Sequence, residues 1–220
     1  MRLRRRAQGG LVRGCCLLIG LIVVVLGASA FIADRALAAP SLGAMPAGPD
    51  HGSSEAAIAV TLGVQLAAEL LGQPHGVVTL SEHDLTVLAR AHNPHPDSLR
   101  NVIARVRDGL VVLEAAHPYG PFTVMPVARI SVTLTQGVTG PLIATHVVEL
   151  DVGELTLPGF IRDRLLGTLA PSLSVNPLFT GSAALKAVRA YLECVLIAHD
   201  GVRIGVHRPG STPQPSVCGA

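Results

Sequence analysis

The sequence predicts an α+β protein, in which an N-terminal transmembrane helix precedes one domain with a curved antiparallel sheet packed against helices. Three patterns predict this fold. Residues 14–33 carry no charged side chain. Apolar residues then recur every four positions over residues 55–71, as they do along one face of a helix. From residue 102 onward the apolar period falls to two and Asp-Gly pairs interrupt it, as in β-hairpins.

The charge-free run is typical of a membrane span. As a helix rising ~1.5 Å per residue, it would extend about 30 Å, the thickness of the hydrocarbon core of a bilayer. The residues before it include Arg2, Arg4, Arg5, Arg6 and Arg13. The positive-inside rule therefore predicts a cytoplasmic basic tail at residues 1–13 and a single-pass signal-anchor at residues 14–35 in the cell membrane. The domain that follows is predicted to be extracytoplasmic.

Two interpretations of this segment remain open. Ala36-Leu37-Ala38 has the small-x-small pattern of a signal-peptidase site, and cleavage after Ala38 would release the domain. The apolar run from Leu17 to Ala33 exceeds the ~7–15 residues of signal-peptide cores, which favours a retained anchor. Residues 36–54 are rich in Pro, Gly, Ala and Ser and predict a flexible linker to a domain at residues 55–208.

Composition excludes one class of partner. Residues 40–220 hold eleven Lys and Arg against fourteen Asp and Glu, a net charge of −3. Nucleic acid needs a clustered basic face, so it is not expected as a partner. The whole chain has four Phe, two Tyr and no Trp, too few for a base-stacking surface. The core of the domain is therefore expected to be aliphatic.

Local signals delimit the predicted helices. The helix over residues 55–71 ends at Gly72, and Val60, Val64 and Leu71 widen its apolar stripe, so most of its circumference is expected to be buried. Ser81, followed three residues later by Asp84, predicts a capping box at the start of a helix over residues 81–91.

Two more helices are predicted later in the chain, at residues 158–169 and 183–192. The first should direct its apolar residues into the core, namely Phe160, Ile161, Leu165, Leu166 and Leu169.

The strands follow from alternation and turn residues. Predicted strands occupy residues 76–80, 102–107, 110–114, 124–135, 142–157, 195–199 and 202–207. Asp108-Gly109 and Asp200-Gly201 supply two hairpin turns, and residues 136–141 supply a third. Residues 209–220 consist mainly of Pro, Ser, Thr and Gly and predict a disordered tail.

The four cysteines divide by location. Cys15 and Cys16 lie at the cytoplasmic end of the apolar run, where they are acylation candidates or simply small apolar side chains. Cys194 and Cys218 lie in the predicted extracytoplasmic part, where an oxidising compartment would let them pair. A disulfide and two free thiols both remain open for this pair.

Several segments together resemble a known family. They are the block Val78–Leu85, the Asp108-Gly109 hairpin, the long strand pair and the run Gly153–Pro158 that leads into a helix. The chain from residue 76 to 207 resembles small membrane-anchored bacterial envelope proteins of the YpmS / LmeA-like (DUF2993) lipid-binding kind. The resemblance implies helices and a curved sheet around a hydrophobic groove, and a lipid-binding or envelope-maintenance role. It carries over no catalytic residues.

The sequence offers no catalytic or metal-binding signature. His92 and His95 are close in sequence, but Pro94 prevents one helix from presenting both to a metal, and no further ligand motif accompanies them. Glu149, Asp151 and Glu154 fit a solvent-facing strand edge better than a carboxylate pair. We therefore expect no metal, no cofactor and no enzymatic activity.

The predicted function is the binding of a lipid or other apolar ligand in a groove between helices and sheet. The candidate groove residues are Leu62, Leu66, Leu85, Leu88, Val132, Leu134, Leu150, Leu165 and Leu166, and a filled core would use the same residues. The alternative is an envelope scaffold that binds another protein and no small molecule. A hydrolase is the third hypothesis, and it would need polar side chains that converge in a pocket.

Overall fold

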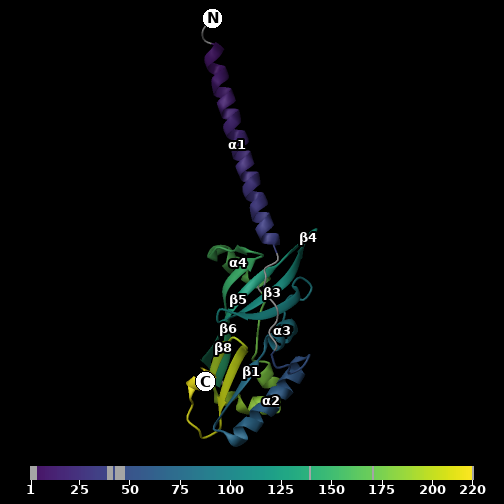
Figure 1. Cartoon of the computed structure of the whole chain (residues 1–220), viewed down its shortest axis with the longest axis vertical. Helices are drawn as coiled ribbons and strands as arrows, with labels where there is room; N and C mark the ends of the chain where they lie inside the picture. Colours follow the sequence, from purple (N-terminus) through teal and green to yellow (C-terminus); the bar gives the residue numbers. More distant parts are fainter. Residues whose placement is uncertain (1–3, 39–41, 43–47, 139, 170, 220) are drawn as a thin grey trace.

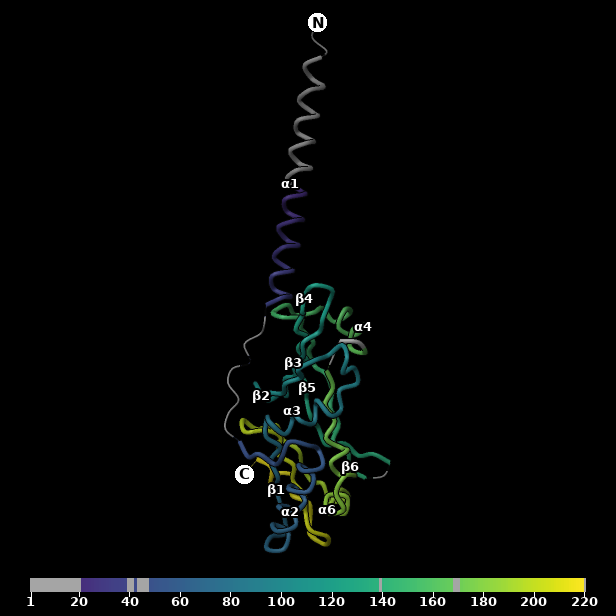
Figure 2. The backbone as a smooth tube through the Cα atoms, turned by 90° about the vertical axis from the view of Figure 1, so that its right-hand side faces the viewer, coloured from purple at the N-terminus to yellow at the C-terminus, as the bar shows by residue number. Residues whose placement is uncertain are grey.

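The computed structural model describes residues 4–38, 42, 48–138, 140–169 and 171–219, with only the backbone described for residues 4–20, 168 and 169. A long helix, α1 (Arg4–Leu37), projects from one end of an elongated body that contains the other elements (Figures 1 and 2). It runs through Ala36 and Leu37 of the possible signal-peptidase site.

The body is α+β, as predicted. Its helices are α2 (Glu55–Gly72), α3 (Glu82–Ala91), α4 (Gly159–Leu169), α5 (Leu178–Gly181) and α6 (Ala183–Val188), with 3-10 turns at Arg189–Tyr191 and Pro215–Gly219. Its strands are β1 (His75–Leu80), β2 (Arg100–Arg107), β3 (Leu110–Tyr119), β4 (Phe122–Val124), β5 (Pro126–Gly137), β6 (Gly140–Val152), β7 (Leu155–Thr156), β8 (Leu192–Ala198) and β9 (Gly201–His207).

The larger of two antiparallel sheets has the strand order β2-β3-β5-β6-β7, with β4 paired to β3. In the β2–β3 turn, Asp108 and Gly109 have φ values of 52° and 72°, as a two-residue type I′ turn requires. Strands β5 and β6 pair as far as Gly137 opposite Gly140. The turn is therefore shorter than the predicted range 136–141, because Gln136, Gly137, Gly140 and Pro141 are paired residues of β5 and β6.

The smaller sheet has the order β1-β9-β8, so the prediction of a single sheet is wrong. The last hairpin pairs with β1, where Thr79 lies opposite Arg203, and does not extend the meander. Gly201 makes this possible, because its φ is +147° and a Cβ there would lie 2.0 Å from the Leu80 carbonyl oxygen. The pairing joins segments far apart in the chain, so no local sequence pattern predicts it.

The core lies between the helices and the two sheets. Helix α2 packs on β1 and α3 packs on β2. The capping box of α3 is confirmed: the Asp84 amide donates to Ser81 Oγ at 3.2 Å, and the Ser81 amide donates to Asp84 Oδ2 at 2.9 Å. A short polar signal in the sequence thus fixes where β1 ends and α3 begins.

The end of the predicted linker belongs to the body. His51 is buried, and its Nδ1 lies 2.7 Å from Asp84 Oδ2. Ser54 then caps α2 by accepting from the Ala57 amide at 3.3 Å. The flexible linker predicted at residues 36–54 is therefore wrong for residues 48–54, and also for Ala36 and Leu37, which belong to α1. Residues 39–41 and 43–47 lie outside the described part of the chain.

The predicted disordered tail is also folded onto the body. A disulfide joins Cys194 on β8 to Cys218. It passes over Gly205, where a Cβ would lie 2.3 Å from Cys194 Sγ. The Gln214 amide donates to Glu193 Oε2 at 2.7 Å and holds the tail at a second point.

Two helices expose apolar residues that were expected to be buried. On α2, Val60, Val64 and Leu71 are 58%, 66% and 85% exposed. On α4, Phe160 is 78% exposed, because this helix lies at the edge of the body against β6. Ile161, Leu165 and Leu166 are half-buried, and the side chain of Leu169 lies outside the described residues.

The helix predicted at residues 183–192 is shorter than expected. It is divided into α6 and a 3-10 turn, and Leu192 already belongs to β8. Leu192 pairs with Val206 of β9, so sheet pairing takes the place of a last helical turn.

Two leucines on α2 test the assignment of its faces. Leu66 is 1% exposed, so Leu66→Ala should lower the free energy of unfolding by about 2–5 kcal/mol, because a cavity replaces the removed atoms. Leu71→Ala, at an exposed position of the same helix, should change it by less than about 0.5 kcal/mol. Urea unfolding in detergent, followed by circular dichroism, measures both values. Equal losses would show that the faces are wrongly assigned.

The double variant Cys194→Ala/Cys218→Ala tests the tail. Its loss of unfolding free energy should be about 3 kcal/mol, because the cross-link closes a loop with a sequence separation of 24. Reductant should lower the unfolding free energy of the wild type by a similar amount and leave that of the variant unchanged. Cys15→Ala/Cys16→Ala is the matched control and should behave as wild type under both conditions. If reductant leaves the unfolding free energy of the wild type unchanged, the cross-link is contradicted.

Candidate functional site

The nine candidate groove residues lie together in the core. Six of them are buried, namely Leu62, Leu66, Leu85, Leu88, Val132 and Leu150. Leu134, Leu165 and Leu166 are partly buried and pack against the same cluster. None of the nine lines any of the four cavities described below. The six buried residues therefore serve as core packing, and Leu134, Leu165 and Leu166 lie at its partly exposed margin.

The end of the body next to α1 is built around a close junction. The Glu154 amide donates to the Arg35 carbonyl at 2.9 Å, and the Arg35 and Glu154 side chains form an exposed ion pair. Gly153 has φ +61°, and a Cβ there would lie 2.4 Å from the Arg35 carbonyl oxygen. Helix α1 thus contacts β4, β6 and β7, and Gly153 lies where a Cβ has no room. Figure 1 shows β4 beside the end of α1.

Helix α4 lies against β6 at this end of the body (Figure 1). Arg162 of α4 donates to the Val148 carbonyl of β6 at 2.9 Å and holds the two elements together. Val148 is 48% exposed, and the half-buried Ile161 and Leu166 belong to the same helix as the exposed Phe160. We call Val148, Phe160, Ile161, Leu165 and Leu166 the α4–β6 layer. It is apolar, partly accessible and close to the end of α1.

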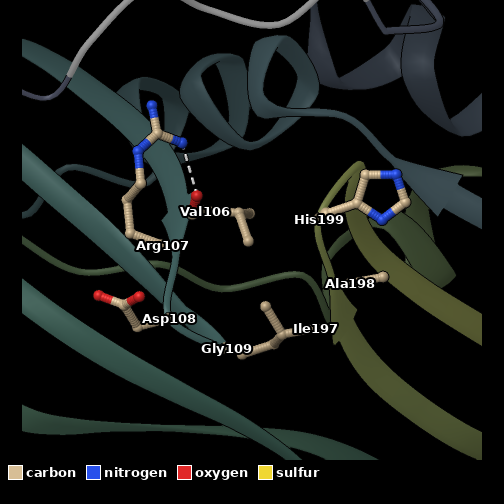
Figure 3. A pocket seen from close by; sticks show the side chains of 7 residues that line it. All are labelled: Val106, Arg107, Asp108, Gly109, Ile197, Ala198 and His199. Carbon is tan, nitrogen blue, oxygen red and sulfur yellow. Dashed lines mark hydrogen bonds between the residues drawn. The ribbon is translucent and has the colours of Figure 1, made fainter.

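Two cavities of mixed polar and apolar lining flank Arg107 and Asp108. One of about 450 Å³ lies between the β2–β3 turn and the end of β8, with His199 across from Arg107 (Figure 3). The other, of about 220 Å³, includes Arg129 and Asp151 in its lining. Arg107 donates to Glu82 Oε1 at 2.9 Å and to the Val106 carbonyl at 2.6 Å. Its Nη2 also donates to the Leu42 carbonyl, so the Arg107 guanidinium serves as a cross-link within the body.

The three carboxylates of the predicted strand edge differ in environment. Glu149 and Asp151 both pair with Arg129, and Asp151 is buried, which corrects the prediction of a solvent-facing edge for that residue. Burial raises the pKa of Asp151, the Arg129 charge opposes that rise, and the Glu149 charge adds to it. Glu154 remains exposed at the α1 junction.

The two neighbouring histidines serve separate contacts. His92 Nε2 lies 2.9 Å from Glu55 Oε2, and His95 Nε2 lies 3.0 Å from the Gly167 carbonyl. The described residues include no cluster of three or more His, Cys, Asp or Glu that could hold a metal ion.

The sequence analysis missed one buried polar contact, between His51 and Asp84. Asp84 Oδ2 lies 2.7 Å from His51 Nδ1 and accepts from Ser81 Oγ at 2.8 Å. His51 also lines a cavity of about 450 Å³ with Gln65 and Glu69. A hydrolase would need the serine on the other ring nitrogen of the histidine, whereas Ser81 bonds the carboxylate. The arrangement therefore ties the chain before α2 to α3. The capping-box Asp was visible in the sequence, but nothing there paired it with His51.

A fourth cavity, of about 410 Å³, lies at the start of α2, between Glu55 and Arg90. Its lining residues give no support to the hydrolase hypothesis, which needs a nucleophile beside a general base.

Length and hydropathy single out one membrane-span candidate among the described side chains, and it is α2. Its inner face carries Ile58, Leu62 and Leu66 into the core, as a core helix does. The charge-free run at residues 14–33 lies within α1, and its first part falls outside the described side chains, as do Cys15 and Cys16.

Comparison of the chain with protein-family models, curated proteins and solved structures finds no match. The resemblance to the YpmS / LmeA-like (DUF2993) kind stays a prediction.

The pH dependence of stability tests the environment of Asp151. Because its pKa is raised in the folded protein, the folded state binds more protons, and the stabilisation present at low pH is lost as pH rises above the ordinary value of 3.8. Asp151→Asn should remove this loss. The difference in unfolding free energy, variant minus wild type, should therefore rise with pH from about 4 to 7, as measured by urea unfolding at a series of pH values.

Glu149→Gln is the companion variant. It removes a like charge beside Asp151 and should narrow the pH range over which stability is lost. A difference curve for Asp151→Asn that falls with rising pH would contradict the raised pKa.

Proposed function

We propose that this chain is a single-pass membrane protein whose extracytoplasmic body binds a lipid or other apolar ligand. Helix α1 is the anchor, with residues 1–13 in the cytoplasm. The ligand binds at the α4–β6 layer, not among the core leucines. No metal or cofactor takes part, and the protein is not an enzyme.

The observation that carries the proposal is the open layer at the end of the body next to α1. Val148 and Phe160 are 48% and 78% exposed there. Exposed apolar surface of this kind commonly marks a site of interaction with a ligand, protein or membrane. A lipid that leaves the bilayer beside α1 would meet this layer first, because α1 contacts β6 and β7.

A specific observation also favours the alternative of an envelope scaffold. Val60, Val64, Ala67 and Leu71 follow the helical repeat along the exposed face of α2. This helix lies at the end of the body away from α1 (Figure 1). An apolar helical stripe far from the membrane is suited to another protein and not to a lipid.

Native mass spectrometry of the gently extracted full chain tests the lipid proposal. The wild type should carry co-purifying lipid, and Val148→Gln should carry several-fold less, because it places an amide in the apolar layer without disturbing the core. Val64→Gln makes the same kind of change on α2 and should retain lipid as the wild type does. A wild type free of lipid, or equal retention by the two variants, would contradict the proposal.

The same variants separate the two functions. A scaffold would lose a cross-linked partner protein from cells on Val64→Gln and retain it on Val148→Gln, which is the opposite pattern.

A further inference from the structure

Exposed aromatic side chains gather at one end of the body. Outside α1 the chain has five Phe and Tyr residues: Tyr119, Phe122, Phe160, Phe179 and Tyr191. Tyr119, Phe122 and Phe160 are 70%, 55% and 78% exposed, whereas Phe179 is buried and Tyr191 is half-buried. The three exposed rings belong to the β3–β4 hairpin and to α4, which both lie at the end where α1 joins (Figures 1 and 2).

The hairpin presents its two rings together. Tyr119 and Phe122 are opposite partners in the β3–β4 ladder, with Gly120 (φ +57°) and Pro121 in the turn between them. Side chains of directly opposite residues project from the same face of a hairpin. The tip therefore carries a pair of aromatic rings with little else around them.

The position of the hairpin along α1 gives its depth. If the membrane span ends at Ala33, α1 continues for one more turn to Leu37, which is about 6 Å at ~1.5 Å per residue. The headgroup layer of a bilayer is about 5–8 Å deep on each side of the hydrocarbon core. The body bonds the Arg35 carbonyl in this last turn, and β4 lies beside the same end of α1 (Figure 1). A span that ends at Ala33 therefore places the hairpin at the height of the headgroups.

We infer that the β3–β4 hairpin tip and Phe160 insert into the outer headgroup layer of the bilayer that α1 crosses. This inference rests on the proposed anchor. Tyr and Trp are enriched at this depth, where a ring meets the acyl chains and a polar group meets water. Insertion at the hairpin and at α4, together with α1, would hold the body against the membrane and keep the α4–β6 layer at its surface.

The chain has no Trp, so single tryptophans report depth without background. Phe122→Trp and Phe160→Trp are the test variants, and Phe31→Trp within α1 reports the anchor itself. Leu71→Trp, at an exposed position of α2, is the matched control for a site far from the membrane. Each full chain is reconstituted in phosphatidylcholine nanodiscs with and without bromine high in the acyl chains, and circular dichroism checks folding.

Bromolipid should quench Phe122→Trp, Phe160→Trp and Phe31→Trp and leave Leu71→Trp unchanged. Phe122→Trp is decisive, because Phe160 belongs to the α4–β6 layer, where a bound lipid could also quench a tryptophan. Quenching of Phe31→Trp without quenching of Phe122→Trp would overturn the inference and leave the anchor intact, whatever the result at Phe160→Trp. Loss of quenching at Phe31→Trp would overturn the anchor and the inference with it. If the fluorescence emission of Phe122→Trp is blue-shifted but not quenched, a protein surface covers the hairpin. If Leu71→Trp is quenched equally, the body adsorbs to the bilayer non-specifically. Both results would also overturn the inference.

Discussion

The close contact between Gly153 and the end of α1 is the constraint on which the orientation of the whole molecule depends. A backbone with φ +61° and no space for a Cβ brings the β6–β7 turn against the Arg35 carbonyl. The Glu154 amide bonds that carbonyl, and the Arg35 and Glu154 side chains pair beside it. The body therefore does not hang from α1 on a free tether. The end of the body that α1 contacts carries the exposed rings and the α4–β6 layer.

A second junction ties the chain before α2 to the start of α3. Asp84 is fully buried and accepts hydrogen bonds from Ser81, while His51 lies against the same carboxylate. A buried carboxylate is costly unless its lone pairs are satisfied, and here they are. Gly201 brings the start of β9 against Leu80, immediately before this junction. Both close approaches depend on glycine at positions where a Cβ would collide with backbone.

The sequence predicts the local features of this fold well. The Ser81–Asp84 cap and the Asp108-Gly109 turn depend on neighbouring residues, so they can be read from short patterns. The division into two sheets could not be read, because it depends on β1 pairing with a strand more than a hundred residues later. The prediction of a disordered tail was wrong for a similar reason. The composition of the tail is typical of disorder, but a disulfide to β8, distant in the sequence, holds it on the body.

The candidate site was harder to predict, because apolar periodicity does not show which faces are covered. Leu85 and Leu150 satisfy the pattern of a groove and that of a filled core equally, and the structure buries both. The same rule assigned Phe160 to the interior, whereas it is among the most exposed side chains of the body. Exposure of a large ring depends on which strands lie beneath the helix, and that is a property of the assembled sheet.

The proposed function requires that α1 crosses the bilayer with the body outside the cytoplasm. Protease protection in membrane vesicles from a bacterial host measures this directly. With the full chain tagged at its N-terminus, protease should digest the body in right-side-out vesicles and leave the tag intact. In inverted vesicles it should digest the tag and leave the body intact. A body that is protected in right-side-out vesicles, or that washes off the membrane without detergent, would contradict it.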